Sequence, residues 1–244
     1  MSADDYTRFN FLKMEPNSTR PVIDAKNLTR IYALGGSEVI GLNAVDLRIA
    51  AGELVVLKGD SGSGKSTLLS LLAGLDRPTR GELMVAENDL ASATPADLTH
   101  FRREVVGMVF QSFNLMPTLN VLENVCLPGL LAGKNPSTIK SKATELLSWL
   151  GLSQRFAHLP AQLSGGEMQR TAIARALIND PAIILADEPT GNLDSRNGQI
   201  VIKLLAELNR KWKRTVVIAT HSNLADSLAT IKFQLKDGMI MDQT

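Results

Sequence analysis

Short apolar runs separated by polar stretches dominate the pattern of the chain. The four clearest runs cover residues 54–57, 104–110, 183–186 and 215–219. Runs of this length that are rich in Val, Ile and Leu are typical of strands buried on both faces of a parallel sheet. The pattern therefore predicts an α/β fold with a mostly parallel core sheet.

Apolar residues at helical spacing lie between these runs. The first stripe runs over residues 68–72 and stops at Gly74, and a second covers residues 139–150 in a helix expected to begin near Ser137 and end at Gly151. A third covers residues 200–208, with Ser195 as the expected N-cap. The second stripe is best explained by core packing, and its helix belongs to an insertion that we place at about residues 112–178.

The two ends of the chain have a different pattern. Strand-like residues 22–25 and 45–49 flank a turn containing Gly35 and Gly36, which indicates an antiparallel edge sheet. Residues 233–235 and 239–241 flank an Asp-Gly turn and predict a terminal hairpin. Residues 1–21 are polar and unpatterned, and we expect a disordered tail there.

Composition narrows the functional classes. The chain has 244 residues, of which 44% are hydrophobic, enough for a full core in one large domain or two small ones. The 26 basic and 25 acidic residues nearly cancel, which disfavours nucleic-acid binding. Cys126 is the single cysteine, so an internal disulfide is excluded and a reducing compartment is expected. No apolar run approaches the roughly 20 residues that span a bilayer, so any membrane association would come through a partner.

A glycine-rich loop follows the first apolar run. The loop residues are Gly59, Asp60, Ser61, Gly62, Ser63, Gly64, Lys65, Ser66 and Thr67. Gly, four residues and then Gly-Lys-Ser, between a strand and a helix, is the spacing that wraps nucleotide phosphates. Lys65 is expected to neutralise the β and γ phosphates, and the Ser66 hydroxyl to bind Mg²⁺. A plain surface turn is the alternative, and the flanking strand and helix argue against it.

Polar side chains at the ends of three other runs are candidates for the reaction itself. Asp187 is expected to hold Mg²⁺ through water, and Glu188 to orient and polarise the attacking water. Gln111 is a candidate contact for Mg²⁺ or that water, and His221 for the γ phosphate. All of these side chains follow strands and should meet at one sheet edge. Solvated acids at a strand end are the alternative for the carboxylates.

A second candidate anion site lies in the run Leu163-Ser164-Gly165-Gly166-Glu167. Ser164, Gly165 and Gly166 open an amphipathic helix, so we expect free backbone N–H groups and a positive dipole end there. Because this site lies far along the chain from the phosphate loop, it is expected to complete the nucleotide site of another chain.

Tyr32 and residues 112–128 are weaker candidates. Tyr32 precedes the Gly35-Gly36 turn, where its ring could stack on adenine, although a lone aromatic residue is more often structural. Residues 112–128 carry more apolar side chains than a loop usually does, and we expect part of them to form a docking groove.

Taken together, these motifs resemble the ABC transporter ATPase family. The phosphate loop, Gln111, the signature at residues 163–167, Asp187-Glu188, Asp194 and His221 occur in family order, over about residue 22 to the C-terminus. The resemblance implies a P-loop NTPase fold of the ABC ATPase type, with an antiparallel β subdomain and a helical subdomain. It also implies ATP and Mg²⁺ as cofactors and a head-to-tail homodimer in which Ser164, Gly165 and Gly166 of one subunit close over ATP held by Lys65 of the other. Glu167 and Asp194 are further nucleotide-binding candidates that the resemblance implies.

Within that family the chain resembles the branch that contains the lipoprotein-releasing LolD and the macrolide-exporting MacB ATPases. The similar runs are residues 72–78, 110–117, 123–125 and 186–194. This branch implies a permease on a separate chain and a location at the cytoplasmic face of the inner membrane. FtsE-like and BceA-like ATPases, which serve cell-wall hydrolases or peptide resistance, remain alternatives. So does a soluble non-transport ABC ATPase, although the long coiled coils or fused second ATPase domain usual there are missing from this sequence. A nucleotide-binding regulator without turnover is disfavoured by Lys65, Asp187, Glu188 and His221.

Overall fold

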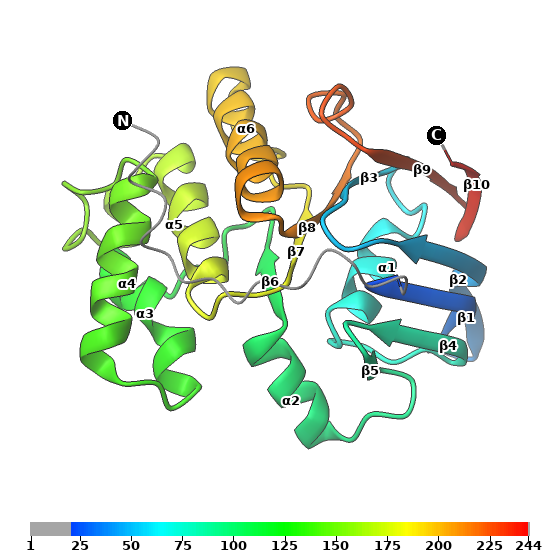
Figure 1. Ribbon diagram of the computed structural model, residues 1–244. Helices are drawn as coiled ribbons and strands as arrows, with labels where there is room; N and C mark the ends of the chain where they lie inside the picture. Colours follow the sequence, from blue (N-terminus) through cyan, green and yellow to red (C-terminus); the bar gives the residue numbers. More distant parts are fainter. Residues whose placement is uncertain (1–20, 244) are drawn as a thin grey trace.

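The protein contains two sheets and a group of helices that flank the larger sheet (Figure 1). A computed structural model describes residues 21–243, so the expected tail lies outside the described residues except for Pro21. The strands are β1 (Ile23–Leu34), β2 (Ser37–Ile49), β3 (Leu54–Lys58), β4 (Arg80–Val85), β5 (Asn88–Asp89), β6 (Val106–Val109), β7 (Ile183–Asp187), β8 (Thr215–Thr220), β9 (Ile231–Lys236) and β10 (Met239–Gln243). The helices are α1 (Lys65–Leu72), α2 (Pro95–Glu104), α3 (Val121–Leu131), α4 (Pro136–Trp149), the 3₁₀ turn η2 (Pro160–Gln162), α5 (Gly165–Leu177) and α6 (Ser195–Trp212).

The larger sheet has the order β10-β9-β3-β8-β7-β6 and is parallel except at β10. Side chains of its central strands alternate between two separate apolar clusters. In β3, Val55 and Leu57 face one cluster, whereas Leu54 and Val56 face the other. β7 and β8 alternate in the same way. A strand covered on both faces needs apolar residues at every position, which explains the continuous runs in the sequence.

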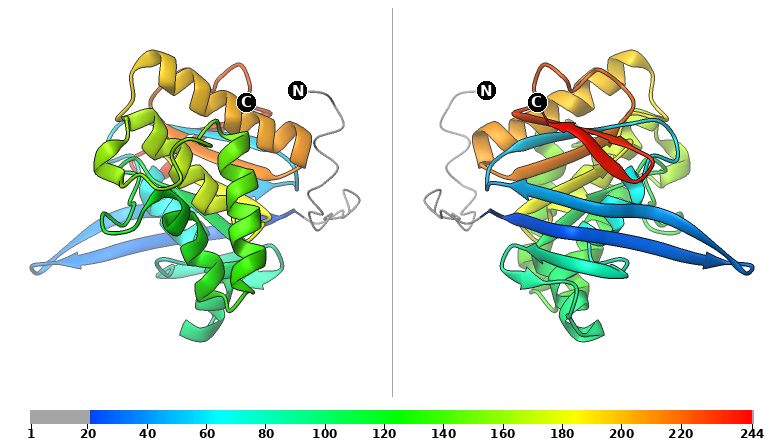
Figure 2. Two further views of the ribbon diagram at one scale, coloured as in Figure 1. Left: turned by 90° about the vertical axis from the view of Figure 1, so that its left-hand side faces the viewer. Right: turned by 90° about the vertical axis from the view of Figure 1, so that its right-hand side faces the viewer.

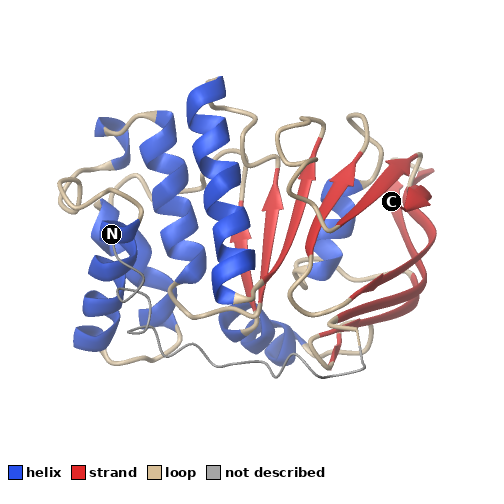
Figure 3. Ribbon diagram, turned by 45° about the horizontal axis from the view of Figure 1, so that its top comes forward, coloured by secondary structure: helices blue, strands red, loops and turns tan. Residues whose placement is uncertain are grey.

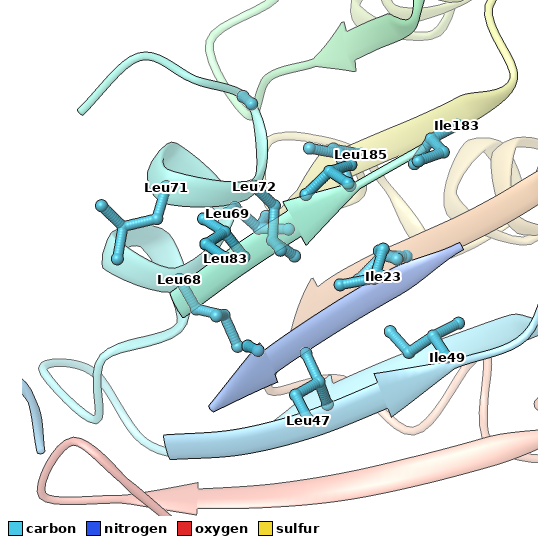
Figure 4. Close-up of a cluster of buried hydrophobic side chains, with 14 of the residues drawn as sticks. Ile23, Leu47, Ile49, Leu68, Leu69, Leu71, Leu72, Leu83, Ile183 and Leu185 are labelled. Atoms are coloured by element: carbon cyan, nitrogen blue, oxygen red, sulfur yellow. The ribbon is translucent and has the colours of Figure 1, made fainter. Parts of the chain in front are cut away.

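The first cluster fills the space between the two sheets, with α1 at its centre. Figure 4 shows Leu68, Leu69 and Leu72 of α1 on the side of the helix that faces the labelled side chains of β1, β2, β4 and β7. Ile23 and Leu71 are fully buried there. Because α1 starts directly after the glycine-rich loop, this packing fixes the loop against both sheets.

The smaller sheet has the order β2-β1-β4-β5 and is antiparallel throughout. The expected antiparallel pairing and the terminal hairpin are both confirmed, but β1 and β2 are much longer than the short strands predicted from the sequence. Their hairpin projects beyond the rest of the molecule, with Gly35 and Gly36 at its tip (Figure 2). Exposed side chains near the tip interrupt the apolar pattern, which is why the sequence indicated only the buried ends.

Helices α3, α4 and α5 lie together on one side of the molecule, next to the parallel strands (Figure 3). Residues 112–128, where the sequence indicated no particular helix, are helical from Val121 onward, because Asn120 and Glu123 form a capping box that starts α3. The N-cap of α6 is Asp194 rather than Ser195, since the Asp194 carboxylate accepts the N–H of Asn197. No helix within residues 21–243 is long and apolar enough to cross a bilayer.

Candidate active site

The carboxyl ends of four parallel strands meet at one edge of the larger sheet. The register places Lys58 beside Thr220, Asp187 beside Ala219 and Val109 beside Ala186. The residues that follow these strands line a cavity of about 510 Å³ together with residues of β1 and β2. Its lining consists of Tyr32, Val39, Ile40, Gly41, Ser61 to Thr67, Gln111, Glu188 and His221. The structure therefore brings together candidates from five separate parts of the sequence.

The glycine-rich loop forms a cradle at the start of α1. Gly62 and Gly64 have φ values of 81° and 105°, and a Cβ atom on Gly64 would lie 2.7 Å from the Gly41 carbonyl oxygen. No atom lies within 4 Å of the position that a Cβ would take at Gly62. The first turn of α1 has no side-chain cap and no acidic residue. Its free N–H groups and dipole thus face the cavity without compensation, as an anion site requires.

Lys65 bends back over this loop. Its side chain is almost fully buried, and Nζ donates hydrogen bonds to the carbonyl oxygens of Gly59 (2.7 Å) and Asp60 (2.9 Å). The buried Ser63 hydroxyl has no hydrogen-bond partner among the described residues. A buried cation and an unpartnered donor beside an open cradle fit a phosphate group.

Ser66 and Asp187 meet across the edge of the sheet. The Ser66 hydroxyl donates a 3.2 Å hydrogen bond to Asp187 Oδ1. Burial raises the pKa of the Asp187 carboxyl, and the Ser66 hydrogen bond opposes this shift. A partly desolvated carboxylate next to a hydroxyl is stabilised by a cation, and both groups offer the oxygen ligands that Mg²⁺ prefers.

The Glu188 carboxylate is held in one orientation by β8 and the residue after it. Oε2 accepts the Thr220 hydroxyl at 3.0 Å, while Oε1 accepts the His221 backbone N–H at 3.1 Å and lies 2.9 Å from His221 Nδ1. The backbone of Glu188 is strained, with φ at 42°. The side chain of Glu188 is mostly buried, whereas that of His221 is exposed. This geometry gives a fixed carboxylate that opens toward the cavity.

Gln111 reaches the same cavity from the end of β6. Its backbone carbonyl oxygen accepts a hydrogen bond from the side-chain amide of Asn192. Its side chain packs against Gly191, where a Cβ atom would lie 2.6 Å from Gln111 Nε2. The turn after Glu188 therefore positions Gln111 as well. Tyr32 also lines the cavity, beside Gly41.

The start of α5 does not line this cavity. Ser164 is the N-cap and forms a reciprocal capping box with Glu167, so one N–H group that the sequence suggested would be free is already bonded. The helical geometry leaves the amides of Gly165 and Gly166 without an intrahelical acceptor. The hydrogen bond from Arg155 holds the pKa of Glu167 at about 2, well below its ordinary value. The Glu167 carboxylate is therefore ionised and offsets the helix dipole at this end.

Asp194 also lies outside the cavity. It caps α6 through Asn197, whose side chain lies so close to Gly166 that a Cβ on that glycine would collide with Asn197 Oδ1. The Asp194 pKa is lowered chiefly by the hydrogen bond from the Asn197 backbone. The start of α5 is thus next to the start of α6.

Sequence reasoning missed several residues around the site. Thr220 orients Glu188, and Gln169 in α5 donates a 2.8 Å hydrogen bond to the carbonyl oxygen of Pro189, the residue after Glu188. Val39 and Ile40 line the cavity beside Tyr32. A polar residue before His221 on a buried strand was a usable signal for Thr220, whereas Gln169 lies within a helix and gave no signal of its own.

The family model described as ABC transporter matches residues 42–191, more than half of the chain and most of the cavity lining. The chain belongs to the ABC transporter ATPase family. It is thus the ATP-hydrolysing subunit of a transporter, as the order of its motifs predicted.

Curated relatives include both free-standing subunits and parts of longer chains. An uncharacterized ABC transporter ATP-binding protein of Methanocaldococcus jannaschii is 45% identical over 91% of this chain and 98% of its own length. The lipoprotein-releasing system ATP-binding protein LolD of Idiomarina loihiensis is 42% identical over 91% and 97%. The macrolide export ATP-binding/permease protein MacB of Wolinella succinogenes is 45% identical, and this chain spans 34% of its length.

Solved structures agree with the ABC ATPase fold. The dimeric post-hydrolysis state of the ATP-binding cassette MJ0796 bound to ADP and phosphate matches with a TM-score of 0.85 and 42% identity, over 91% of this chain and 97% of that one. The sequence-based prediction of an α/β ABC ATPase fold is confirmed.

Proposed function

We propose that this ABC ATPase holds ATP in the 510 Å³ cavity and hydrolyses it with Glu188 as the group that orients and polarises water. The observation that carries the proposal is the fixed Glu188 carboxylate, which faces the same cavity as the cradle around Lys65. Lys65 leaves its two carbonyl partners for the phosphates, and His221 contacts the γ phosphate from the exposed side. A general base within reach of the reacting group contributes about 10²- to 10⁴-fold to the rate.

Mg²⁺ fits between the cradle and the sheet edge. The Ser66 hydroxyl and the Asp187 carboxylate already meet there, and the side chain of Gln111 lines the same cavity, so these three residues are the proposed ligands, with Asp187 acting through water. Bound Mg²⁺ would neutralise charge on the phosphates.

The start of α5 is proposed to complete the site in a head-to-tail homodimer. Its glycine amides lie outside the cavity of their own chain. An acceptor from a second copy is the natural partner for them. The dimeric form of the related MJ0796 cassette supports this arrangement.

A membrane permease on a separate chain is the proposed partner. A second cavity of about 310 Å³ lies where α2, β6, α3 and α5 meet. Apolar residues of β6 and three arginines, Arg102, Arg103 and Arg175, line it. Of the segment expected to form a docking groove, Asn114 and Pro128 contribute to its lining. The similarity to LolD and MacB supports a permease of the lipoprotein-release or macrolide-export type, which would hold the subunit at the cytoplasmic face of the inner membrane.

Glu188→Gln tests the catalytic part of this proposal. The amide keeps the size of the side chain but cannot act as a base, so kcat should fall about 1000-fold while ATP affinity is retained. Steady-state ATPase assays together with calorimetric titration of ATP measure both quantities. A variant that hydrolyses ATP at the wild-type rate would remove Glu188 from the mechanism.

The same variant tests the partner. Glu188→Gln, loaded with ATP and Mg²⁺, is used to capture proteins from detergent-solubilised native membranes, with Lys65→Ala as the control that should not retain ATP. Enrichment of a permease with a large extracytoplasmic domain over the control supports the transporter assignment. Enrichment of ribosomal or DNA-repair proteins without any membrane protein contradicts it.

A further inference from the structure

The ring of Tyr32 is fixed by two charged residues that the nucleotide cavity does not include. The Tyr32 hydroxyl donates a 3.0 Å hydrogen bond to Asp76 Oδ2, and Arg30 Nε donates a 2.8 Å hydrogen bond to the same oxygen. The Arg30 guanidinium carbon lies 4.4 Å from the centroid of the Tyr32 ring. Arg30 and Asp76 are each about one-quarter exposed, so this cation–π contact and its ion pair are partly shielded from water.

These contacts leave one side of the ring for the nucleotide. Tyr32 lines the 510 Å³ cavity, whereas Arg30 and Asp76 line a different cavity of about 620 Å³ with Arg77 and Arg102. Gly41, another residue of the cavity lining, lies next to the ring, because a Cβ atom there would be 2.8 Å from Tyr32 Cε2. Of these three residues only Tyr32 lines the nucleotide cavity, so Arg30 and Asp76 would influence a bound base through its ring.

Asp76 also connects the ring to the phosphate cradle. It follows α1, the helix that begins at Lys65, and its backbone N–H donates to the Ser70 carbonyl oxygen at 3.3 Å. Asp76 is thus attached to the end of α1, while Tyr32 belongs to β1 in the smaller sheet. The hydrogen bond between them sets the position of the ring relative to the cradle.

We propose that Asp76 and Arg30 are positioning residues for adenine recognition, which hold the Tyr32 ring at the height and angle that stacking on an ATP base requires. This rests on the proposed function of the cavity. A ring that is already ordered loses little side-chain entropy when the base binds. Most of the free energy of stacking therefore contributes to the affinity for ATP. Arg30 occupies one face, which leaves the other as the stacking face.

Asp76→Asn and Tyr32→Phe test the proposal. Asparagine weakens the ion pair with Arg30 and the acceptor for Tyr32, and phenylalanine keeps the ring but removes its anchor. Each variant should raise the KM for ATP about fivefold, part of the usual value of one stacked base, with kcat unchanged. The double variant should show no larger change than Asp76→Asn alone, because Tyr32→Phe removes only the hydrogen bond to Asp76 that Asp76→Asn already weakens. Arg30→Lys, which keeps the charge but loses the planar stack, should fall between wild type and Asp76→Asn.

The control is Asp24→Asn, which breaks a similar ion pair with Arg48 at the far end of β1 and should leave KM unchanged. A fall in kcat without a change in KM, or effects of Asp76→Asn and Tyr32→Phe that add in the double variant, would overturn the positioning role. If Tyr32→Ala weakens ATP binding but Asp76→Asn and Tyr32→Phe do not, this inference fails and the proposed nucleotide site stands. If neither Tyr32→Ala nor Lys65→Ala affects ATP binding, the proposed site itself is wrong.

Discussion

The starts of α1 and α5 are both glycine-containing helix N-termini, yet only the start of α5 carries a side-chain cap and an acidic residue. α1 follows Gly64, with no side-chain cap and no acid in its first turn. α5 follows Ser164, which forms a capping box with Glu167, and the Glu167 carboxylate stays ionised because its pKa is about 2. One helix end is left electrostatically uncompensated, and the other is compensated before any ligand arrives.

The two helix starts therefore differ in how strongly each can bind an anion within one subunit. An uncompensated dipole, a buried lysine and an open cradle favour a highly charged phosphate chain within a single subunit. The start of α5 offers two glycine amides beside a carboxylate, so its attraction for a free anion is small. We infer that α5 contributes only when another group has already placed the phosphate, as a partner subunit would. In the proposed homodimer, a site divided in this way would make the association of the two subunits depend on nucleotide.

Lys65→Ala tests the stronger half of the comparison and should have the largest effect. Loss of a buried, charge-assisted contact to phosphate should weaken ATP binding about 100-fold. Ser164→Ala, at the weaker half, should leave the ATP affinity of the isolated subunit unchanged. Calorimetric titration at low protein concentration measures both variants. Equal losses of affinity would show that the two helix ends act alike, and the comparison would fail.

Several features of this comparison were visible in the sequence. The cradle, its strand and its helix were predicted because continuous apolar runs and glycine spacing are local signals, and the ABC fold they indicated is confirmed. α2 was missed, although Thr94 and Asp97 form its capping box and Pro95 opens it, because its polar composition hides its apolar stripe. The contacts of Asp76 with Tyr32 and of Gln169 with Pro189 join distant segments, and no local pattern encodes such pairs.

The contact between Gly166 and Asn197 gives a sharper test of the weaker half. A methyl group at Gly166 would collide with the Asn197 side chain, which also bonds Asp194. Gly166→Ala should therefore displace the start of α5 and lower kcat about tenfold, while ATP affinity in the isolated subunit is kept. Removing the obstacle in the Gly166→Ala, Asn197→Ala double variant should restore part of the rate. A double variant as slow as Gly166→Ala would mean that the glycine is needed for approach of a ligand rather than for contact with Asn197.

Glu167→Gln tests the electrostatic difference itself and should have the smallest effect. The folded state lowers the Glu167 pKa from its ordinary 4.5 to about 2, mainly through Arg155, so the ionised form stabilises the protein at pH values above the unfolded pKa. That contribution is lost as the pH falls from 4.5 toward 2. Glutamine should cost about 1 kcal/mol at neutral pH, the usual size of a capping contribution, and less in acid. Urea unfolding across this pH range measures this gap, the difference in free energy of unfolding between wild type and Glu167→Gln. The control is Glu207→Gln, which removes the ion pair between Glu207 and Lys211 in α6. A gap that keeps its full size near the lower end of the range would show that the Glu167 charge does not compensate the start of α5.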